Sequence, residues 1–126
     1  MAAYQKVASE IKEGLTEDQA FEIWRSELRR RGEAARTSLA KEAVANWSER
    51  KNVPYWQMHT MNLGAGYVEG PLRAGMVIDF EPIVSIGGQG YYLEDMYLIS
   101  KAGAEVLTPG VPYTAEEIEN FLARKQ

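Results

Sequence analysis

The chain has 126 residues, a formal net charge of −4, 45% hydrophobic and 25% charged residues, and no cysteine. This length and composition are those of one globular domain that can bury a core. The lack of cysteine excludes a disulfide framework, a thiolate zinc site and a cysteine nucleophile. We expect a single domain over 1–126, with a helical part (1–52), a sheet part (53–113) and a closing helix (114–126).

Charge is distributed unevenly along the chain. Residues 1–52 carry ten Lys/Arg and nine Asp/Glu, whereas 53–126 carry four and nine, so the halves sum to +1 and −5. The acidic half favours a cation as ligand, or is a solvated surface. The negative charge disfavours nucleic acid, and no apolar run approaches the roughly 20 residues that cross a bilayer. The N-terminus has no signal-peptide pattern, so we expect a cytoplasmic protein without nucleic-acid or membrane partners.

Three helices are expected in the first half, from apolar residues that recur at helical spacing. Their ranges are 2–13, 16–32 and about 34–48, and a glycine closes each of the first two. The second begins with a capping-box pair, Thr16 and Gln19. Nothing in these helices suggests catalytic chemistry, and we expect their aromatic residues to be core.

After residue 54 the pattern changes to short strands separated by glycine-containing turns. The expected strands are 55–61, 76–86, 91–100 and 104–107. Thr114 and Glu117 form a second capping-box pair that begins the last helix. N-terminal helices packed on an antiparallel sheet, with a C-terminal helix, make the predicted fold class α+β.

Three acidic residues lie where the second and third of these strands meet. Asp79 and Glu81 share one face of a strand, about 6–7 Å apart, because alternate residues of a strand point the same way. The turn at 87–90 brings Glu94 back beside them. Carboxylates on neighbouring strands repel unless a cation or a shared proton compensates. The alternative is that all three are exposed charges on the solvated face of the sheet.

His59 is the only histidine and lies on the strand just upstream. A lone histidine is more often structural than a ligand, so its significance depends on its neighbours. With Glu81 and Glu94 it forms a set of hard oxygens and one imidazole, which suits Mn, Fe, Co or Zn. We therefore predict a divalent metal site at these three residues, with Asp79 as a candidate fourth ligand. No residue is assigned a catalytic role.

Two motifs surround these acids: a strand Gly75-Met76-Val77 that leads to Glu81-Pro82, and Leu93-Glu94-Asp95 with its tail to Thr108. They resemble motifs of the pita-bread metallopeptidases, the family of methionine aminopeptidase, Xaa-Pro aminopeptidase, prolidase and creatinase. The resemblance covers most of the chain and corresponds to the C-terminal half of the family's domain. It implies a pita-bread-like fold, an aminopeptidase-type hydrolase, and metal ligation by His59, Glu81 and Glu94.

The chain departs from the family pattern at several positions. Gly66 stands where the family has a second histidine that assists catalysis, and Tyr92 where Xaa-Pro aminopeptidases have an arginine. The family's two metal-binding aspartates precede its helices and have no match here, since Asp18 lies in a helix-capping segment. Asp79 stands where the family has a small hydroxyl residue, so it is a possible replacement ligand.

Three functions are compatible with these residues. An active metallohydrolase would need a second chain to supply the missing aspartates. A mononuclear metal enzyme of different chemistry would use the remaining ligands. A non-catalytic, dimerising or partner-binding module would cover apolar surface with another subunit. We expect a metallopeptidase-like domain that is not a competent peptidase alone, and either a homodimer or a partner chain that completes the fold.

Overall fold

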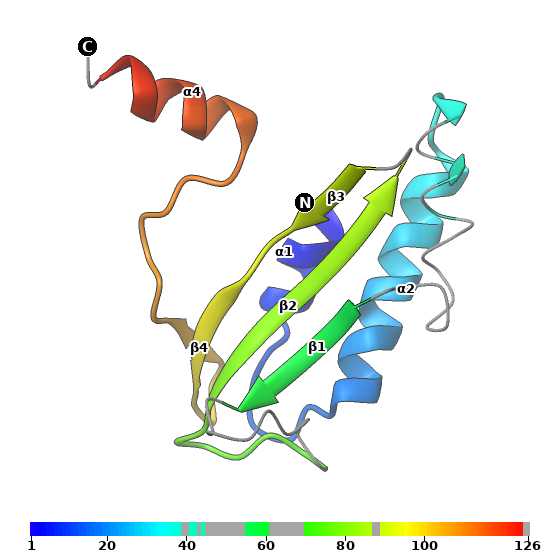
Figure 1. Cartoon of the computed structure of the whole chain (residues 1–126). Coiled ribbons are helices and arrows are strands. Elements are labelled where there is room, and N and C mark those ends of the chain that lie inside the picture. Colours follow the sequence, from blue (N-terminus) through cyan, green and yellow to red (C-terminus); the bar gives the residue numbers. More distant parts are fainter. Residues whose placement is uncertain (39–40, 43, 45–54, 61–69, 87–88, 125–126) are drawn as a thin grey trace.

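The structure is a computed structural model that describes residues 1–38, 41–42, 44, 55–60, 70–86 and 89–124 (Figure 1). Its elements are α1 (Ala2–Ala8), α2 (Glu17–Glu33), β1 (Tyr55–Thr60), β2 (Val77–Ile86), β3 (Gln89–Tyr92), β4 (Asp95–Ile99), β5 (Ala104–Val106) and α4 (Ala115–Ala123). Helices, then strands, then a helix confirm the predicted α+β order.

The strands form one antiparallel sheet in the order β1-β2-β4-β5, and β3 also pairs with β2. The long strand β2 is therefore the centre of the sheet. Its register with β1 pairs Met58 with Phe80 and His59 with Asp79. Because paired residues of an antiparallel ladder share a face, each of these pairs belongs to one side of the sheet.

α1 and α2 contact each other, and the core lies between them and one face of the sheet. Tyr4 of α1 stacks on Phe80 of β2, with ring centroids 4.9 Å apart and ring planes 16° apart. The buried core consists of Ala3, Tyr4, Val7, Ile11, Ala20, Phe21, Trp24, Met58, Leu72, Ile78, Phe80, Tyr97 and Ile99. In β2 these are the even positions, so Asp79 and Glu81 lie on the opposite face.

α1 is shorter than the sequence predicted. The predicted helix reached residue 13, but α1 ends at Ala8. Gly14 has a φ of 90°, a left-handed conformation that glycine adopts without steric cost. Its N–H donates to the carbonyl of Leu72 at 2.9 Å, and the Leu72 N–H donates to the carbonyl of Leu15 at 2.8 Å. Within the predicted range, the Glu13 N–H donates to the carbonyl of Ser100 at 3.1 Å, so pairing with distant segments takes the place of the last helical turn.

The other predicted boundaries differ from the structure at few points. α2 continues one residue beyond Gly32, to Glu33. The predicted strand 91–100 is interrupted at Leu93 and Glu94, which separate β3 from β4. Most of the predicted helix 34–48 lies outside the described residues, although positions 38, 41, 42 and 44 are helical.

Both predicted capping boxes are present. Thr16 Oγ1 accepts from the N–H of Gln19 at 3.2 Å, and Gln19 Oε1 accepts from the N–H of Thr16 at 3.0 Å. Thr114 and Glu117 repeat this pattern at 3.1 and 3.0 Å. The helices differ in packing, because α2 contributes to the core whereas α4 buries no residue and lies apart from α1 and α2 in Figure 1.

Within the described part of the chain, no helix combines the length and the apolar character that a membrane crossing requires.

Candidate functional site

The face of the sheet that points away from α1 and α2 carries the predicted site positions. Asp79 and Glu81 alternate on β2 with the core residues Ile78 and Phe80. The Asp79 side chain is only 3% exposed, Glu81 is half-buried and Glu94 is exposed. The alternative in which all three acids are solvated surface charges is therefore wrong for Asp79. Removing a carboxylate from water costs free energy unless other groups compensate. The burial of Asp79 therefore distinguishes it from an ordinary surface charge.

The register of β2 suggests where its acids lie relative to the next strands. The pairs nearest to Glu81 are Phe80 with Asp95 and Ile83 with Tyr92. Both fit one antiparallel alignment, and extending it across the interruption at Leu93 and Glu94 would set positions 81 and 82 opposite 94 and 93. This extended alignment is the basis for treating Glu81 and Glu94 as neighbours across the sheet. Like charges in this arrangement destabilise a sheet, and a bound cation would reverse the sign of that effect.

The neighbouring rung holds the other two predicted ligands. His59 of β1 pairs with Asp79, and Asp79 pairs on its other side with Met96 of β4. Rungs two residues apart on one face are separated by about 6–7 Å along the strand. The backbone therefore places His59 and Asp79 on one rung and Glu81 beside it on the same face, and the extended alignment would add Glu94. The His59 side chain lies outside the described part of the structure.

The described side chains alone do not make a complete metal site. Among these described side chains, which do not include that of His59, no three His, Cys, Asp or Glu residues lie close enough together to hold an ion. The predicted ligands on these rungs are carboxylate oxygens and one imidazole. These ligand types are ones that Mn, Fe, Co and Zn accept. A site here requires the His59 side chain or movement of the exposed Glu94.

Asp95 is held by a cluster of hydroxyl groups on the helix-covered face. Tyr4 donates to Asp95 Oδ2 at 2.6 Å, and Thr108 Oγ1 donates to Oδ1 at 2.7 Å. The Tyr97 hydroxyl lies 3.3 Å from that of Tyr4, and the Met96 N–H donates to Thr108 Oγ1 at 3.4 Å. Burial and the hydrogen bond to Asp95 raise the pKa of Tyr4 above its ordinary value, so this hydroxyl stays protonated and remains a donor.

The sequence did not predict this hydroxyl cluster. In the sequence, Asp95 is distinguished only as part of the Leu93-Glu94-Asp95 motif. A signal was present, because consecutive residues of a strand face opposite sides. If Glu94 faces the open side of the sheet, then Asp95 must face the helices, where a carboxylate needs hydrogen-bond donors.

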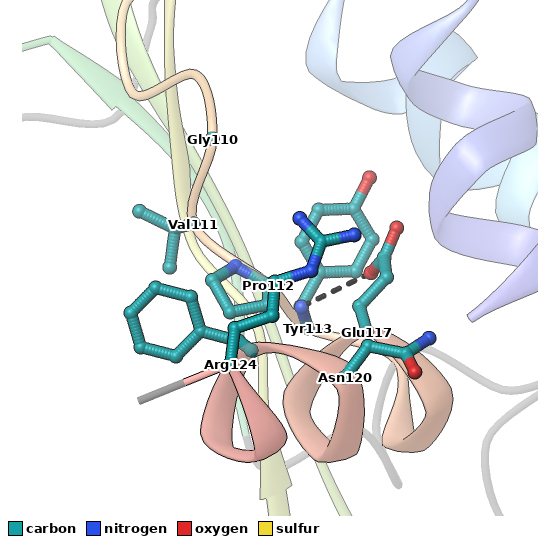
Figure 2. A pocket seen from close by; sticks show the side chains of 8 residues that line it. Gly110, Val111, Pro112, Tyr113, Glu117, Asn120 and Arg124 are labelled. Atoms are coloured by element: carbon teal, nitrogen blue, oxygen red, sulfur yellow. Dashed lines mark hydrogen bonds between the residues drawn. The ribbon is translucent and has the colours of Figure 1, made fainter. Parts of the chain in front are cut away.

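A hollow of about 440 Å³ lies beside α4 and is lined by residues between 110 and 124. Val111, Pro112, Phe121 and Arg124 are among the side chains that line it (Figure 2). Glu117 accepts a hydrogen bond from the Tyr113 N–H at 3.3 Å, drawn as the dashed line in Figure 2. This hollow contains none of the predicted metal ligands.

No family model and no curated protein matches the sequence. Solved structures do share its fold. Proline aminopeptidase P II from Yersinia pestis matches with a TM-score of 0.69 and 22% identity, over 98% of this chain and 33% of that chain. Aminopeptidase P from E. coli with the inhibitor Pro-Leu matches at 0.66 and 24%, over 99% and 33%. Prolidase from Pyrococcus furiosus matches at 0.64 and 22%, over 88% and 31%.

These matches confirm the predicted pita-bread-like α+β fold. The chain spans about one third of the length of the structures that it matches. At these identities the similarity concerns the fold, and ligands and activity are matters for a proposal.

Proposed function

We propose that this chain is a metallopeptidase-like module, related to Xaa-Pro aminopeptidase and prolidase, that binds one divalent cation on the open face of its sheet. The observation that supports the proposal is the register of β2, which pairs Asp79 with His59 and, when extended past Asp95, would set Glu81 opposite Glu94. The aminopeptidase P and prolidase matches support the relationship through the fold.

The ligands in this proposal are Glu81, Glu94 and His59, with Asp79 as the fourth. Asp79 is supported as the fourth ligand because it pairs with His59 in the register and is buried on the face that carries Glu81. The ion would be Mn, Fe, Co or Zn, because hard oxygens and one imidazole suit these metals. When bound, it would polarise a carbonyl group or lower the pKa of a bound water.

One position explains why we propose that the chain is not a competent peptidase alone. The family resemblance calls for a second histidine that assists catalysis, and this sequence has Gly66 at that place. Without this histidine the site lacks the family's means of moving protons. Peptide hydrolysis would therefore require another group that takes over this role. An alternative is a mononuclear metal enzyme of different chemistry.

Metal binding is tested by titrating metal-free protein with Mn²⁺ in a calorimeter, alongside elemental mass spectrometry of the purified protein. We expect one ion per chain for the natural sequence and an affinity at least about tenfold lower for Glu81→Gln with Glu94→Gln. Glu116→Gln, an exposed acid on α4, is the matched control and should bind normally. Absence of binding, or equal binding by the double variant, would overturn the proposal.

The role of Asp79 has its own test. Asp79→Asn keeps the size of the side chain and removes its charge. We expect weaker Mn²⁺ binding in the same titration, because a charged oxygen ligand near the ion is lost. Unchanged affinity would remove Asp79 from the ligand set and leave the three-residue site intact.

The second candidate function is a non-catalytic, dimerising or partner-binding module. It is favoured by the C-terminal segment, whose apolar side chains are exposed and whose helix α4 buries no residue. Those exposed side chains are Val111, Tyr113, Ile118, Phe121 and Leu122. Large apolar side chains gathered on one exposed segment are typical of interfaces.

A homodimer predicts twice the mass of one chain by light scattering at micromolar concentration. Leu122→Asp should reduce that mass, whereas Glu119→Gln on the same helix should not. A mass equal to one chain for the natural sequence would contradict the homodimer and leave a different partner chain as the remaining form of this candidate.

A further inference from the structure

Glu94 and Asp95 are consecutive acids, and the register between β2 and β4 determines which of them faces the open side of the sheet. Neighbouring residues of a strand face opposite sides, so a slip of one residue between β2 and β4 would exchange them. Asp95 would then face Glu81, and Glu94 would face α1. Whether Glu94 reaches the open face thus depends on what fixes the register of this hairpin.

The usual determinants of register are weak at this hairpin. β4 is apolar on both faces, because Met96 and Leu98 alternate with the buried Tyr97 and Ile99. An alternating polar and apolar pattern, which ordinarily selects the register, is absent from these four residues. The connection at 87–90 reads Gly-Gly-Gln-Gly, and glycine restricts the backbone least.

The hydroxyl cluster around Asp95 distinguishes the observed register from the slipped one. Tyr4 and Thr108 donate to the two different oxygens of Asp95, at 2.6 and 2.7 Å. These donors come from α1 and from the segment after β5, so they hold Asp95 from two sides. Tyr4 is itself fixed, since it is buried and stacks on Phe80, the residue that pairs with Asp95.

A slipped register would break this arrangement. Glu94, one methylene longer, would have to enter the space that fits Asp95 between two fixed donors. The hydroxyl groups would otherwise lose their acceptor, and a buried donor without an acceptor is costly. The cluster therefore disfavours the slipped register, although it lies on the face of the sheet opposite the proposed metal site.

We infer that Asp95 is a positioning residue: Tyr4 and Thr108 hold it on the helix-covered face and thereby commit Glu94 to the rung with Glu81. The inference rests on the proposed function for its consequence, since Glu94 matters there as a ligand. That two hydroxyl donors hold a single register does not depend on whether a metal binds.

The test uses the variant Tyr4→Phe with Thr108→Val, which removes both hydroxyl groups and nearly preserves side-chain shape. Cross-strand proton contacts between β2 and β4, measured by NMR in the full chain, report the register directly. We expect one set of contacts in the natural sequence and a second set, displaced by one residue, in the double variant. Mn²⁺ affinity should fall by about tenfold, as for other residues that orient a ligand.

Tyr97→Phe is the matched control, because it removes a neighbouring buried hydroxyl that does not bond to Asp95. It should keep the single register and the Mn²⁺ affinity. If the double variant fails to fold, Thr108→Val alone is the second variant, since Thr108 is only half-buried and valine has its shape.

Each outcome bears on one proposal. A single native register in the variants would overturn the inference, whatever happens to Mn²⁺ binding. If the natural sequence binds no Mn²⁺, the proposed function fails, and a displaced register in the variants would still support the positioning role of Asp95.

Discussion

α2 and α4 begin with the same chemistry and have different surroundings. Each has a threonine N-cap whose partner three residues later closes a capping box. α2 then buries Ala20, Phe21 and Trp24, whereas α4 buries no residue. The pair shows that a capping box determines where a helix begins, and that packing of an apolar face determines whether the helix belongs to the core.

The largest difference should come from removing an aromatic side chain from each helix. Trp24 is 4% exposed and Phe121 is 45% exposed. Trp24→Ala should lower the free energy of unfolding by about 3–5 kcal/mol, because it leaves a cavity. Phe121→Ala should change it by less than about 0.5 kcal/mol. Urea denaturation measures both, and a loss above about 1 kcal/mol for Phe121→Ala would show that α4 is packed in solution.

A smaller contrast should come from the two N-caps. Thr16→Ala should lower the free energy of unfolding by about 1 kcal/mol, because α2 and the core unfold together. Thr114→Ala removes the same hydrogen bond but should leave global unfolding unchanged and reduce only the helicity of α4, read from NMR carbon chemical shifts. Equal global losses from the two changes would refute the contrast.

The smallest effect should be the pH response of the caps, since Gln19 in α2 cannot titrate and Glu117 in α4 can. Hydrogen bonds from the backbone N–H and the hydroxyl of Thr114, and from the Tyr113 N–H, lower the pKa of Glu117 from its ordinary 4.5. A lowered pKa stabilises α4 above pH 4.5, and that stabilisation is lost as pH falls through the folded-state pKa.

We therefore expect the first turn of α4 to lose helicity on acidification while the first turn of α2 does not. An NMR titration follows both turns in one sample. Glu117→Gln converts the second box to the chemistry of the first and should abolish the response. Persistence of the pH dependence in Glu117→Gln would assign it to another group.

Local sequence signals predicted the elements that local chemistry controls. Both capping boxes and the strands around Asp79 and Glu81 lie where the pattern of residues placed them. The predicted end of the first helix was wrong, because Ile11 keeps helical spacing and is buried without being helical. The chain after Ile11 instead bonds to distant segments, Glu13 to Ser100 and Gly14 to Leu72, and no local period encodes these contacts.

The candidate site divides in the same way. The shared face of Asp79 and Glu81 was predictable, because it follows from alternation along a strand whose even positions are buried in the core. The burial of Asp79 was not, since the pattern fits a solvated strand face equally well. The donors to Asp95 were also missed, because they come from a helix and a loop that are distant in the sequence.

The hydrogen bond between Tyr4 and Asp95 has a consequence for the order in which the elements fold. Its two residues are 91 positions apart, so closing this contact costs more chain entropy than closing a turn. α1 has seven residues, too few to form a stable helix in isolation. Contacts of such high sequence separation slow folding, and we expect α1 to become ordered only after the β2–β4 hairpin offers it a surface. We therefore expect α1 to be among the last of the described elements to fold.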